Sequence, residues 1–480
     1  MSSNRKNYKK AHPYTVIDYT PGIIPLLLLP GLQHLLFNPT TLTELITNYG
    51  LSALFSLMIL TSVILEYLNI LYIERETRLY AKKGFFYKSH SDIPYNCIQS
   101  VYIKKNMFPM LFGARQYYIY TPGSFLSHGS YSIYLSKKKT NGLSSTIFGD
   151  EKPMFTYHGG FFKTILMAAT RSNTLTGLLI IAPVLYKTSS VTNQLLKLYF
   201  QNTMDIIRYI ISIAVPEAIS GFATLLIAGW VIAFTVQLER YSFFTLEIGE
   251  TAIRIKRGIF NRVEFITATK KINAIQIRQS IIMLLLNLKS TYIKTVGSGV
   301  QKGDMGLLIP ADKDAHTNEI LKRITSLQKQ EDYKVRPVKT EFFSFLWFPI
   351  YSIGGDILTM VVLYRLGYFG EIVRVPLIVL LVVFVYWLFF RIYSYTQSEI
   401  TICDKAVRID FFDKLNITRT YIPYDRIQYV EVYQSPFQRL YKVANVKVYV
   451  YSNKTSSYRI KNLKYDKVMH AVELIENRMA

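Results

Sequence analysis

The sequence predicts a multi-pass α-helical membrane protein in which pairs of membrane spans alternate with three small β-rich domains. Three observations lead to this fold class: the apolar stretches occur in pairs, a basic and strand-rich segment follows each pair, and one short motif recurs in all three segments. Half of the 480 residues are hydrophobic, the mean hydropathy is +0.18, and the formal net charge is +24. Such a composition is typical of membrane spans that alternate with basic, water-facing domains.

The apolar stretches divide the chain into a tail, three hairpins of two spans each, and three β-rich segments. The tail covers residues 1–21, the transmembrane hairpins cover 22–72, 172–238 and 341–393, and the β-rich segments cover 73–171, 239–340 and 394–480. A span needs about 20 apolar residues, and the second stretch of each hairpin reaches that length. The first stretches of the first two hairpins, near 22–37 and 174–186, are marginal, so each of them either crosses fully or re-enters.

The distribution of Lys and Arg predicts the orientation of the spans. Residues 38–50, which connect the first two spans, contain neither Lys nor Arg, whereas the tail and the three β-rich segments are rich in both. Basic residues next to spans are retained on the cytoplasmic side. We therefore expect both termini and all three β-rich domains to lie in the cytoplasm, next to a cell membrane that the chain crosses six times.

Within the β-rich segments, apolar and polar side chains alternate as they do in half-buried strands. Residues 445–451 are the clearest case, since every second side chain is a valine. Each segment ends in a helical pattern, strongest around Ile320 to Leu327 and weakest around Phe161 to Ala169. Several short strands closed by one amphipathic helix predict a small barrel with a helix at its open end.

One motif recurs in the three segments. It reads Ile-Pro-Tyr-Asp-Arg-Ile from Ile422 to Ile427, Ile-Pro-Tyr-Asn-Cys-Ile from Ile93 to Ile98, and a divergent Thr-Ala-Thr-Lys-Lys-Ile that ends at Ile272. Prolines Pro94 and Pro423 cannot donate a ladder hydrogen bond, so we expect each to begin a strand or to lie at an edge or bulge. The isoleucines of the motif are expected in the core, which makes the motif a structural element.

The spacing around the motif supports a true internal repeat. Fourteen residues before the last isoleucine of each copy stands Gly84, Gly258 or Asp413, and thirteen residues after it stands a leucine, which is Leu111, Leu285 or Leu440. Gly and Asp tolerate positive φ, so each repeat is expected to place a hairpin turn shortly before the motif.

Together with the run Gln-Ser-Pro-Phe-Gln-Arg-Leu that ends at Leu440, the motif resembles the bacterial pleckstrin-homology-like (PH-like) domain of the membrane-anchored type, bPH2. Three copies, each after a pair of spans, make the chain similar to the YdbT family of bacterial membrane proteins. The resemblance implies three cytoplasmic PH-like β-barrel domains of seven strands, each capped by a C-terminal helix, with no catalytic residues. The second copy is divergent.

No group of residues in the sequence suggests catalysis. The seven histidines are scattered, and the two cysteines, Cys97 and Cys403, lie in different repeats. Phosphate-binding loops, nucleophile elbows and metal-ligand spacings are missing from the sequence. We therefore expect neither an enzyme nor a cofactor or metal site. Nucleic acid is also not expected as a partner, because the charge is spread over three tethered domains without a recognition helix.

Two groups of residues remain as candidate sites. The first group contains basic residues near the predicted hairpins, which either contact anionic lipid, as the corresponding loop of eukaryotic PH domains does, or only fix the topology: Lys82, Lys83, Lys88, Lys256, Arg257, Arg262, Arg408, Lys414 and Arg419. The second is an intramembrane polar site at Asp356, which either pairs with Arg365 or a neighbouring span, or binds a ligand.

These observations predict a non-enzymatic, membrane-anchored PH-like scaffold that binds a protein partner or anionic lipid at the cytoplasmic face. Its expected partners are membrane lipids and either another membrane protein or a second copy of itself. The family resemblance suggests a role in envelope maintenance or in resistance to membrane-active compounds. The alternative is a transporter or channel whose pore or ion site involves Asp356.

Overall fold

The computed structural model describes residues 8–19, 42–85, 87–122, 131–149, 151–172, 205, 209, 217–296, 298, 306–324, 331–338, 342–368, 370–413, 416–451 and 456–479. The chain forms two compact units. The first contains residues 1–157, 245–271 and 295–304, and the second contains residues 158–244, 272–294 and 305–480. Each unit is described by itself.

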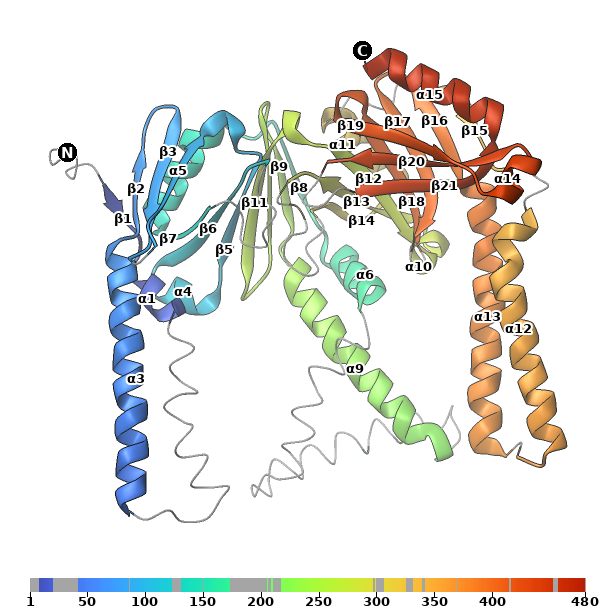
Figure 1. Ribbon diagram of the computed structural model, residues 1–480, viewed down its shortest axis with the longest axis horizontal. Helices are drawn as coiled ribbons and strands as arrows, with labels where there is room; N and C mark the ends of the chain where they lie inside the picture. Colours follow the sequence, from blue (N-terminus) through green and yellow to red (C-terminus); the bar gives the residue numbers. More distant parts are fainter. Residues whose placement is uncertain are drawn as a thin grey trace. The chain divides into compact units, whose positions relative to one another are not determined.

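The first unit contains two open antiparallel sheets (Figure 1). One sheet has the order β1-β2-β3-β4, with β1 (Lys9–Lys10), β2 (Leu71–Glu74), β3 (Arg78–Lys83) and β4 (Ser89–Pro94). The other has the order β7-β6-β5-β11-β10-β9-β8, with β5 (Ser100–Lys105), β6 (Ala114–Tyr120), β7 (Tyr131–Ser136), β8 (Phe155–His158), β9 (Thr245–Ile248), β10 (Ala252–Arg257) and β11 (Arg262–Ala268). Leu79 of the first sheet and Val101 of the second meet in one core, which Leu143 of helix α5 (Lys137–Phe148) completes.

The second unit repeats this arrangement. Its larger sheet has the order β14-β13-β12-β18-β17-β16-β15, with β12 (Ala274–Ser280), β13 (Leu288–Lys294), β14 (Leu307–Lys313), β15 (Glu331–Val335), β16 (Glu399–Cys403), β17 (Ala406–Asp413) and β18 (Asn416–Pro423). Its smaller sheet contains β19 (Ile427–Tyr433), β20 (Val443–Val450) and β21 (Ser456–Lys464). Helix α15 (Tyr465–Met479) packs Val468, Ala471 and Ile475 into the core between the two sheets.

The described strands thus fall into three sets of seven, as the resemblance implied: β1–β7, β8–β14 and β15–β21. We call these sets the first, second and third repeat. The expected closed barrels are wrong, because the sheets are open. In a closed barrel both edges of β5 would pair within its own repeat. Here one edge of β5 pairs with β11 of the second repeat, and one edge of β12 pairs with β18 of the third.

The two pairings between repeats share one register. Val101 of β5 lies opposite Ile266 of β11, and Ile275 of β12 lies opposite Tyr421 of β18. When the repeats are aligned on the motif, Val101 corresponds to Ile275, and Ile266 corresponds to Tyr421. The same edges of successive repeats are therefore joined in the same way. We call these two pairings the junctions.

The recurring motif forms the corner at which the chain passes from one sheet to the other. In each copy a single 3₁₀ turn connects two strands, at Tyr95–Cys97, Thr269–Lys271 and Tyr424–Arg426. Ile422 and Ile427 are buried in the core on either side of the last corner, as expected. Pro94 and Pro423 end strands β4 and β18, so the expectation that they begin strands is wrong, although β4 is an edge strand.

The predicted hairpin turns are confirmed at both glycines. Gly84 follows β3 with φ of 98°, and Gly258 follows β10 with φ of 97°. A Cβ atom at Gly84 would lie 1.9 Å from the carbonyl oxygen of Tyr87, so the tight turn requires glycine there. Asp413 is the last residue of β17, and the two residues after it lie outside the described part of the chain.

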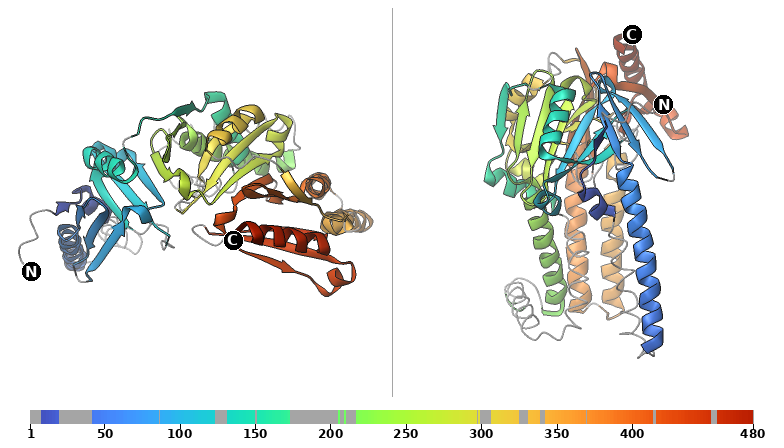
Figure 2. Two further views of the ribbon diagram at one scale, coloured as in Figure 1. Left: turned by 90° about the horizontal axis from the view of Figure 1, so that it is seen from above. Right: turned by 90° about the vertical axis from the view of Figure 1, so that its left-hand side faces the viewer.

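Four long helices alternate with these strands. They are α3 (Leu42–Leu68), α9 (Glu217–Tyr241), α12 (Phe342–Arg365) and α13 (Glu371–Gln397). Among the described residues, three segments are long and apolar enough to cross a membrane, namely Ala223–Tyr241, Leu346–Arg365 and Val373–Gln397, and Ala53–Leu68 is a shorter apolar helix. Helices α12 and α13 lie side by side in Figures 1 and 2, with the rings of Phe348 and Trp387 5.1 Å apart. The predicted spans near 22–37 and 174–186 lie outside the described residues.

Shorter helices complete the fold. They are α1 (Tyr14–Tyr19), α4 (Met107–Leu111), α6 (Phe161–Arg171), α10 (Ile281–Leu285), α11 (Asp314–Ile324) and α14 (Pro436–Leu440). The expectation that 161–169 closes the first repeat is wrong, because α5 occupies that place and α6 instead contacts α9 and β14. The amphipathic pattern of α6 shows that one face of the helix is buried, but it does not show which repeat the helix packs on.

The strand before each predicted transmembrane hairpin pairs with the strand after it. Lys10 of β1 lies opposite Leu71 of β2, Val335 of β15 lies opposite Ile400 of β16, and β8 neighbours β9. The chain therefore enters and leaves each hairpin within one sheet.

Candidate functional sites

A cavity of about 110 Å³ lies at the end of helix α13 in the second unit, and we call it the basic cavity. Helix α13 and its C-cap contribute Arg391, Ser394 and Ser398, while β17 and β21 supply the remaining lining residues: Phe411, Phe412, Arg459, Ile460, Lys461 and Asn462. None of the described residues that line it is acidic. The cavity therefore combines three cations with hydroxyl and amide groups, which suits a phosphate oxygen.

The local structure explains why these side chains converge. Strand β21 alternates, so Tyr458 and Ile460 enter the core while Arg459 and Lys461 point away from it. Residues 391, 394 and 398 lie on one face of α13, because they are three and four positions apart. Burial lowers the pKa of Lys461, and the positive charges of Arg459 and Arg391 lower it further. A bound anion would relieve this repulsion.

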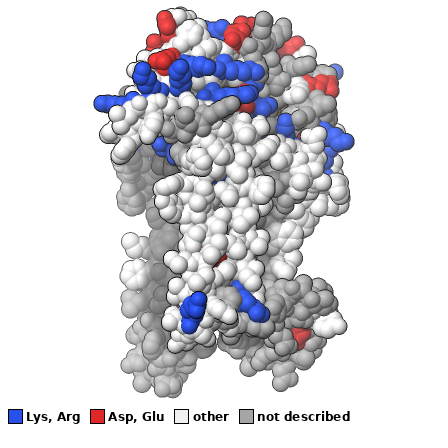
Figure 3. Space-filling view, turned by 90° about the vertical axis from the view of Figure 1, so that its right-hand side faces the viewer, with Lys and Arg blue, Asp and Glu red and all other residues white. Residues whose placement is uncertain are grey.

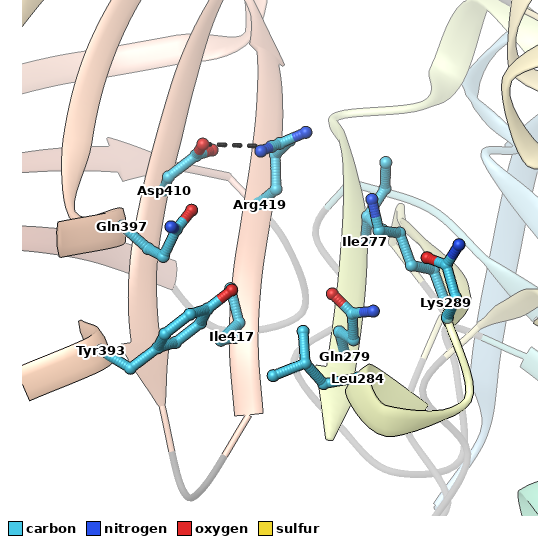
Figure 4. Close-up of a pocket in the computed structure, with 10 residues that line it drawn as sticks. Ile277, Gln279, Leu284, Lys289, Tyr393, Gln397, Asp410, Ile417 and Arg419 are labelled. Carbon is cyan, nitrogen blue, oxygen red and sulfur yellow. Dashed lines mark hydrogen bonds and ion pairs between the residues drawn. The ribbon is translucent and has the colours of Figure 1, made fainter. Parts of the chain in front are cut away.

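A second cavity, of about 240 Å³, lies beside the junction of β12 and β18 (Figure 4). Tyr393 and Gln397 of α13 line one side, and Gln279 and Lys289 line the other. Here one acid offsets part of the positive charge of Lys289 and Arg419, since Arg419 Nε lies 3.0 Å from Asp410 Oδ2. This cavity is mixed and polar, and it carries less positive charge than the basic cavity.

Asp410 and Arg419 belong to a larger ion network on the same sheet. Arg408 forms ion pairs with Glu399 and with Asp410, and Arg336 Nε lies 2.8 Å from Glu399 Oε2. Burial raises the pKa of Asp410 despite the opposing charges of Arg419 and Arg408. Burial also acts to raise the pKa of Glu399, but its bonds with Arg336 and Arg408 outweigh burial and lower it. The network ties β16, β17 and β18 together.

The network changes the interpretation of two predicted lipid contacts. Arg408 and Arg419 are engaged by carboxylates, so their charge is neutralised locally. Lys414, the third predicted contact in this repeat, lies outside the described residues. Phe412, next to the same hairpin tip, packs its ring 4.6 Å from that of Phe390 in α13. The end of β17 therefore lies beside a candidate membrane span.

The other predicted lipid contacts lie on two separate hairpins of the first unit. Lys82 and Lys83 end β3, and Lys88 is exposed in the following turn. Lys83 lines a cavity with Ile70, two residues after the end of α3. On the second hairpin three predicted contacts have different environments, with Lys256 paired to Glu247, Arg257 buried, and Arg262 donating to the carbonyl of Ile259 at 3.1 Å. The described residues therefore do not form one site.

Sequence reasoning missed all three cations of the basic cavity. Arg391 is contributed by a helix that ends some sixty residues before β21 begins. The sequence did contain a signal for this cluster of cations. Arg459 and Lys461 stand at alternate positions of a predicted strand, so they share one face, and Arg391 stands near the end of a predicted span. In Figure 3 the surface of α12 and α13 is almost without charge, and Lys and Arg side chains gather above it.

The predicted intramembrane polar site is only partly formed. Asp356 is 5% exposed within α12, and its Oδ2 atom has no hydrogen-bond partner among the described residues. Arg365 lies nine residues further along the same helix, which corresponds to a rise of about 13.5 Å. Among the described residues Asp356 forms no ion pair with Arg365, so its pairing with a neighbouring span and its binding of a ligand stay predictions.

Each repeat also exposes an apolar helix tip. The leucines at the recurring position thirteen residues after the motif lie at the ends of α4, α10 and α14, and Leu111, Leu285 and Leu440 are 74%, 80% and 78% exposed. Around Leu111, Phe108 and Phe112 are exposed as well. Leu284 of α10 lines a cavity with Tyr393 of α13, so this tip lies beside a candidate span.

The described residues define a class of protein: sets of seven strands in antiparallel sheets, repeated three times along the chain and alternating with long apolar helices. A model of the family described as Bacterial PH domain matches residues 24–147, 205–324 and 358–479, which together cover more than half of the chain. The chain therefore belongs to the bacterial PH domain family, bPH2, with three copies, including the divergent second one. No curated protein matches it.

Proposed function

We propose that this protein is a non-enzymatic, membrane-anchored scaffold whose third repeat binds the phosphate of an anionic lipid in the basic cavity. The observation that carries the proposal is the convergence of Arg391, Arg459 and Lys461 at the end of helix α13. Anionic lipid is concentrated at the cytoplasmic leaflet, and each nearby cation contributes about 1 kcal/mol to its binding.

The strand pairings support the cytoplasmic orientation in this proposal. Because β1 pairs with β2 and β15 with β16, each hairpin returns to the side from which it left. Together with the basic residues of the repeats, this favours six spans with both termini and all three repeats in the cytoplasm. The junctions would then join strands of neighbouring repeats by main-chain hydrogen bonds.

The test compares two double variants of the full chain in nanodiscs. Arg459→Gln/Lys461→Gln removes two cations of the basic cavity, whereas Lys464→Gln/Lys467→Gln removes two exposed cations nearby on β21 and α15. At about 1 kcal/mol per cation, the first variant should lower the affinity for anionic lipid by roughly 30-fold. The control should retain nearly all of it. Equal losses in both variants would show that the charge acts without a defined site.

The pH dependence adds a second readout. As the pH rises, Lys461 loses its proton and lipid binding should weaken. Because the pKa of Lys461 is lowered, this loss should begin at a pH below the ordinary lysine value of 10.5. In Lys461→Gln this step should disappear. If the wild-type protein and Lys461→Gln gave the same pH profile, Lys461 would not contribute to binding.

For the biological role we propose envelope maintenance or resistance to membrane-active compounds. A scaffold that holds lipid and protein at the membrane surface suits such a role. A deletion strain should be more sensitive than its parent to envelope stress and to antimicrobial peptides. Identical survival of the two strains across a panel of such stresses would contradict this role.

A transporter or channel remains the second candidate function. It is favoured by the buried Oδ2 atom of Asp356, which has no hydrogen-bond partner among the described residues. Unpaired acids inside membrane spans often belong to ion or proton pathways.

A further inference from the structure

The junctions leave two strand edges without a partner among the described residues. Successive repeats are joined by pairing the fifth strand of one repeat with the fourth strand of the next, as β5 pairs with β11 and β12 with β18. The fifth strand of the third repeat is β19, and the fourth strand of the first repeat is β4. Both end their sheets, β4 in the first repeat and β19 in the third.

The burial of these strands shows that each edge is open. Val101 and Ile275 are 0% and 1% exposed inside the junctions. Beside them, Ser100 and Ala274 are fully buried, but the corresponding residue of β19, Tyr429, is 51% exposed. Strand β4 behaves in the same way, since Ser89 and His90 at its start are exposed. The two edges therefore offer unpaired backbone groups to another strand.

The sequences of the open strands match those of an existing junction. β4 reads Ser-His-Ser-Asp-Ile-Pro, and the end of β18 reads Thr-Arg-Thr-Tyr-Ile-Pro. From Tyr429 the chain reads Tyr-Val-Glu-Val-Tyr-Gln-Ser, and β12 reads Ala-Ile-Gln-Ile-Arg-Gln-Ser. Thus β4 resembles β18 and β19 resembles β12, and β12 and β18 pair with each other.

We propose that β4 of one molecule pairs with β19 of a second copy of this chain, in the register of the junctions. Aligned on the motif, that register places Asp92 opposite Val430, Ser91 opposite Glu431, and His90 opposite Val432. The contact continues the arrangement of repeats from one molecule to the next. It does not depend on lipid binding in the basic cavity.

One side-chain contact of the junction is reproduced in this register. Gln276 Nε2 donates a hydrogen bond to Thr420 Oγ1 across the junction of β12 and β18, at 3.3 Å. The equivalent residues at the open edges are Glu431 and Ser91. The Ser91 hydroxyl donates to the Glu431 carboxylate in the proposed contact, which is a stronger, charge-assisted bond. Asp92 remains at the rim, where Arg78 Nη1 lies 2.9 Å from it.

The contact is heterologous, because it joins two different edges. Such contacts either close into rings or extend as filaments. Two edges on one chain are sufficient, so no other protein is required. Anchoring in a membrane helps further, since confinement raises the effective concentration of the edges.

The test is disulfide formation between two full-length chains that each carry one introduced cysteine beside the buried Cys403, mixed in proteoliposomes. Both chains carry Cys97→Ser, because Cys97 is exposed. One chain also carries Ser91→Cys and the other Glu431→Cys. Residues opposite each other in antiparallel strands have Cα atoms about 4.5–5.5 Å apart, within the range that a disulfide spans. Only the mixture should yield a crosslinked dimer.

Two controls make the outcome decisive. Gln276→Cys/Thr420→Cys in one chain occupies the equivalent positions of an existing junction, so its internal disulfide reports folding and reactivity. Tyr429→Cys in place of Glu431→Cys is displaced by two residues, to a diagonal distance of about 7–8 Å, and should not react with Ser91→Cys.

Four results would overturn the proposal. The mixture gives no dimer while the junction control forms its disulfide, or the Tyr429→Cys mixture reacts as strongly as the Glu431→Cys mixture. Alternatively, Ser91→Cys chains crosslink by themselves, or a single chain that carries both Ser91→Cys and Glu431→Cys closes only on itself.

Discussion

Replacing Ile266 with alanine is expected to destabilise the first repeat, although Ile266 belongs to the second. Ile266 lies on β11, is 1% exposed, and packs into the same core as Val101 and Tyr117 of the first repeat. Removing a buried isoleucine side chain typically costs about 2–5 kcal/mol. Amides of β5 and β6 that exchange by opening of this core should then exchange faster, by roughly 30-fold at the lower limit.

Hydrogen exchange of the full chain, measured by mass spectrometry in nanodiscs, tests this prediction. The matched control is Ile255→Ala, because Ile255 lies in the same sheet on the neighbouring strand β10 and is 2% exposed, but is not part of the first-repeat core. We expect faster exchange in β6 only for Ile266→Ala. Unchanged exchange in β6, or equal effects of both variants, would refute the idea that the repeats share a core across the junction.

The remaining predictions concern the helix tips, the ion network and the intramembrane acid. A fluorophore attached at Leu111→Cys in a Cys97→Ser background should be quenched by quenchers dissolved in the lipid phase. A fluorophore attached to native Cys97, at the opposite end of β5, should not be quenched. Equal quenching at both positions would contradict insertion of the helix tip into the membrane. Glu399→Gln should cost up to about 3–5 kcal/mol at neutral pH, because Arg408 loses one of its two buried acidic partners and keeps only Asp410. Because the pKa of Glu399 is lowered in the folded protein, its carboxylate stabilises the fold at a pH above the unfolded pKa of 4.5, and this stabilisation is lost as the pH falls through the lowered folded pKa. In denaturant unfolding, the difference in unfolding free energy between wild type and variant should therefore shrink in acid. A difference that stays constant with pH would be evidence against the ion pair. If the protein transports ions, flux into proteoliposomes should disappear in Asp356→Asn, and a wild-type protein without flux would rule this function out.

Much of the fold was predictable because its signals are local. Hydrophobic length marked the candidate spans in α9, α12 and α13. Gly84 and Gly258 marked hairpin turns, since only glycine fits the backbone there. The offset leucines marked a repeat whose purpose was not evident from sequence, and the structure shows them exposed at helix tips.

The errors have a common physical cause. A strand pattern states which face is buried, but it does not state which strand pairs with its edge, because the ladder is made by main-chain groups that every residue carries. The sequence therefore suggested closed barrels, whereas in the structure the edge strands of neighbouring repeats pair with each other. Likewise, the sequence did not show that Arg408 and Arg419 lie beside Glu399 and Asp410, because only the pairing of the strands brings these side chains together.

The sequence by itself determined that this protein has three PH-like repeats that alternate with long apolar stretches, because periodicity and turn chemistry act within a few residues of the chain. Only the tertiary structure decided that β5 joins β11 and β12 joins β18 in one register, and that α13 and β21 bring Arg391, Arg459 and Lys461 into one cavity. Both results depend on contacts between segments distant in sequence, which local patterns do not encode.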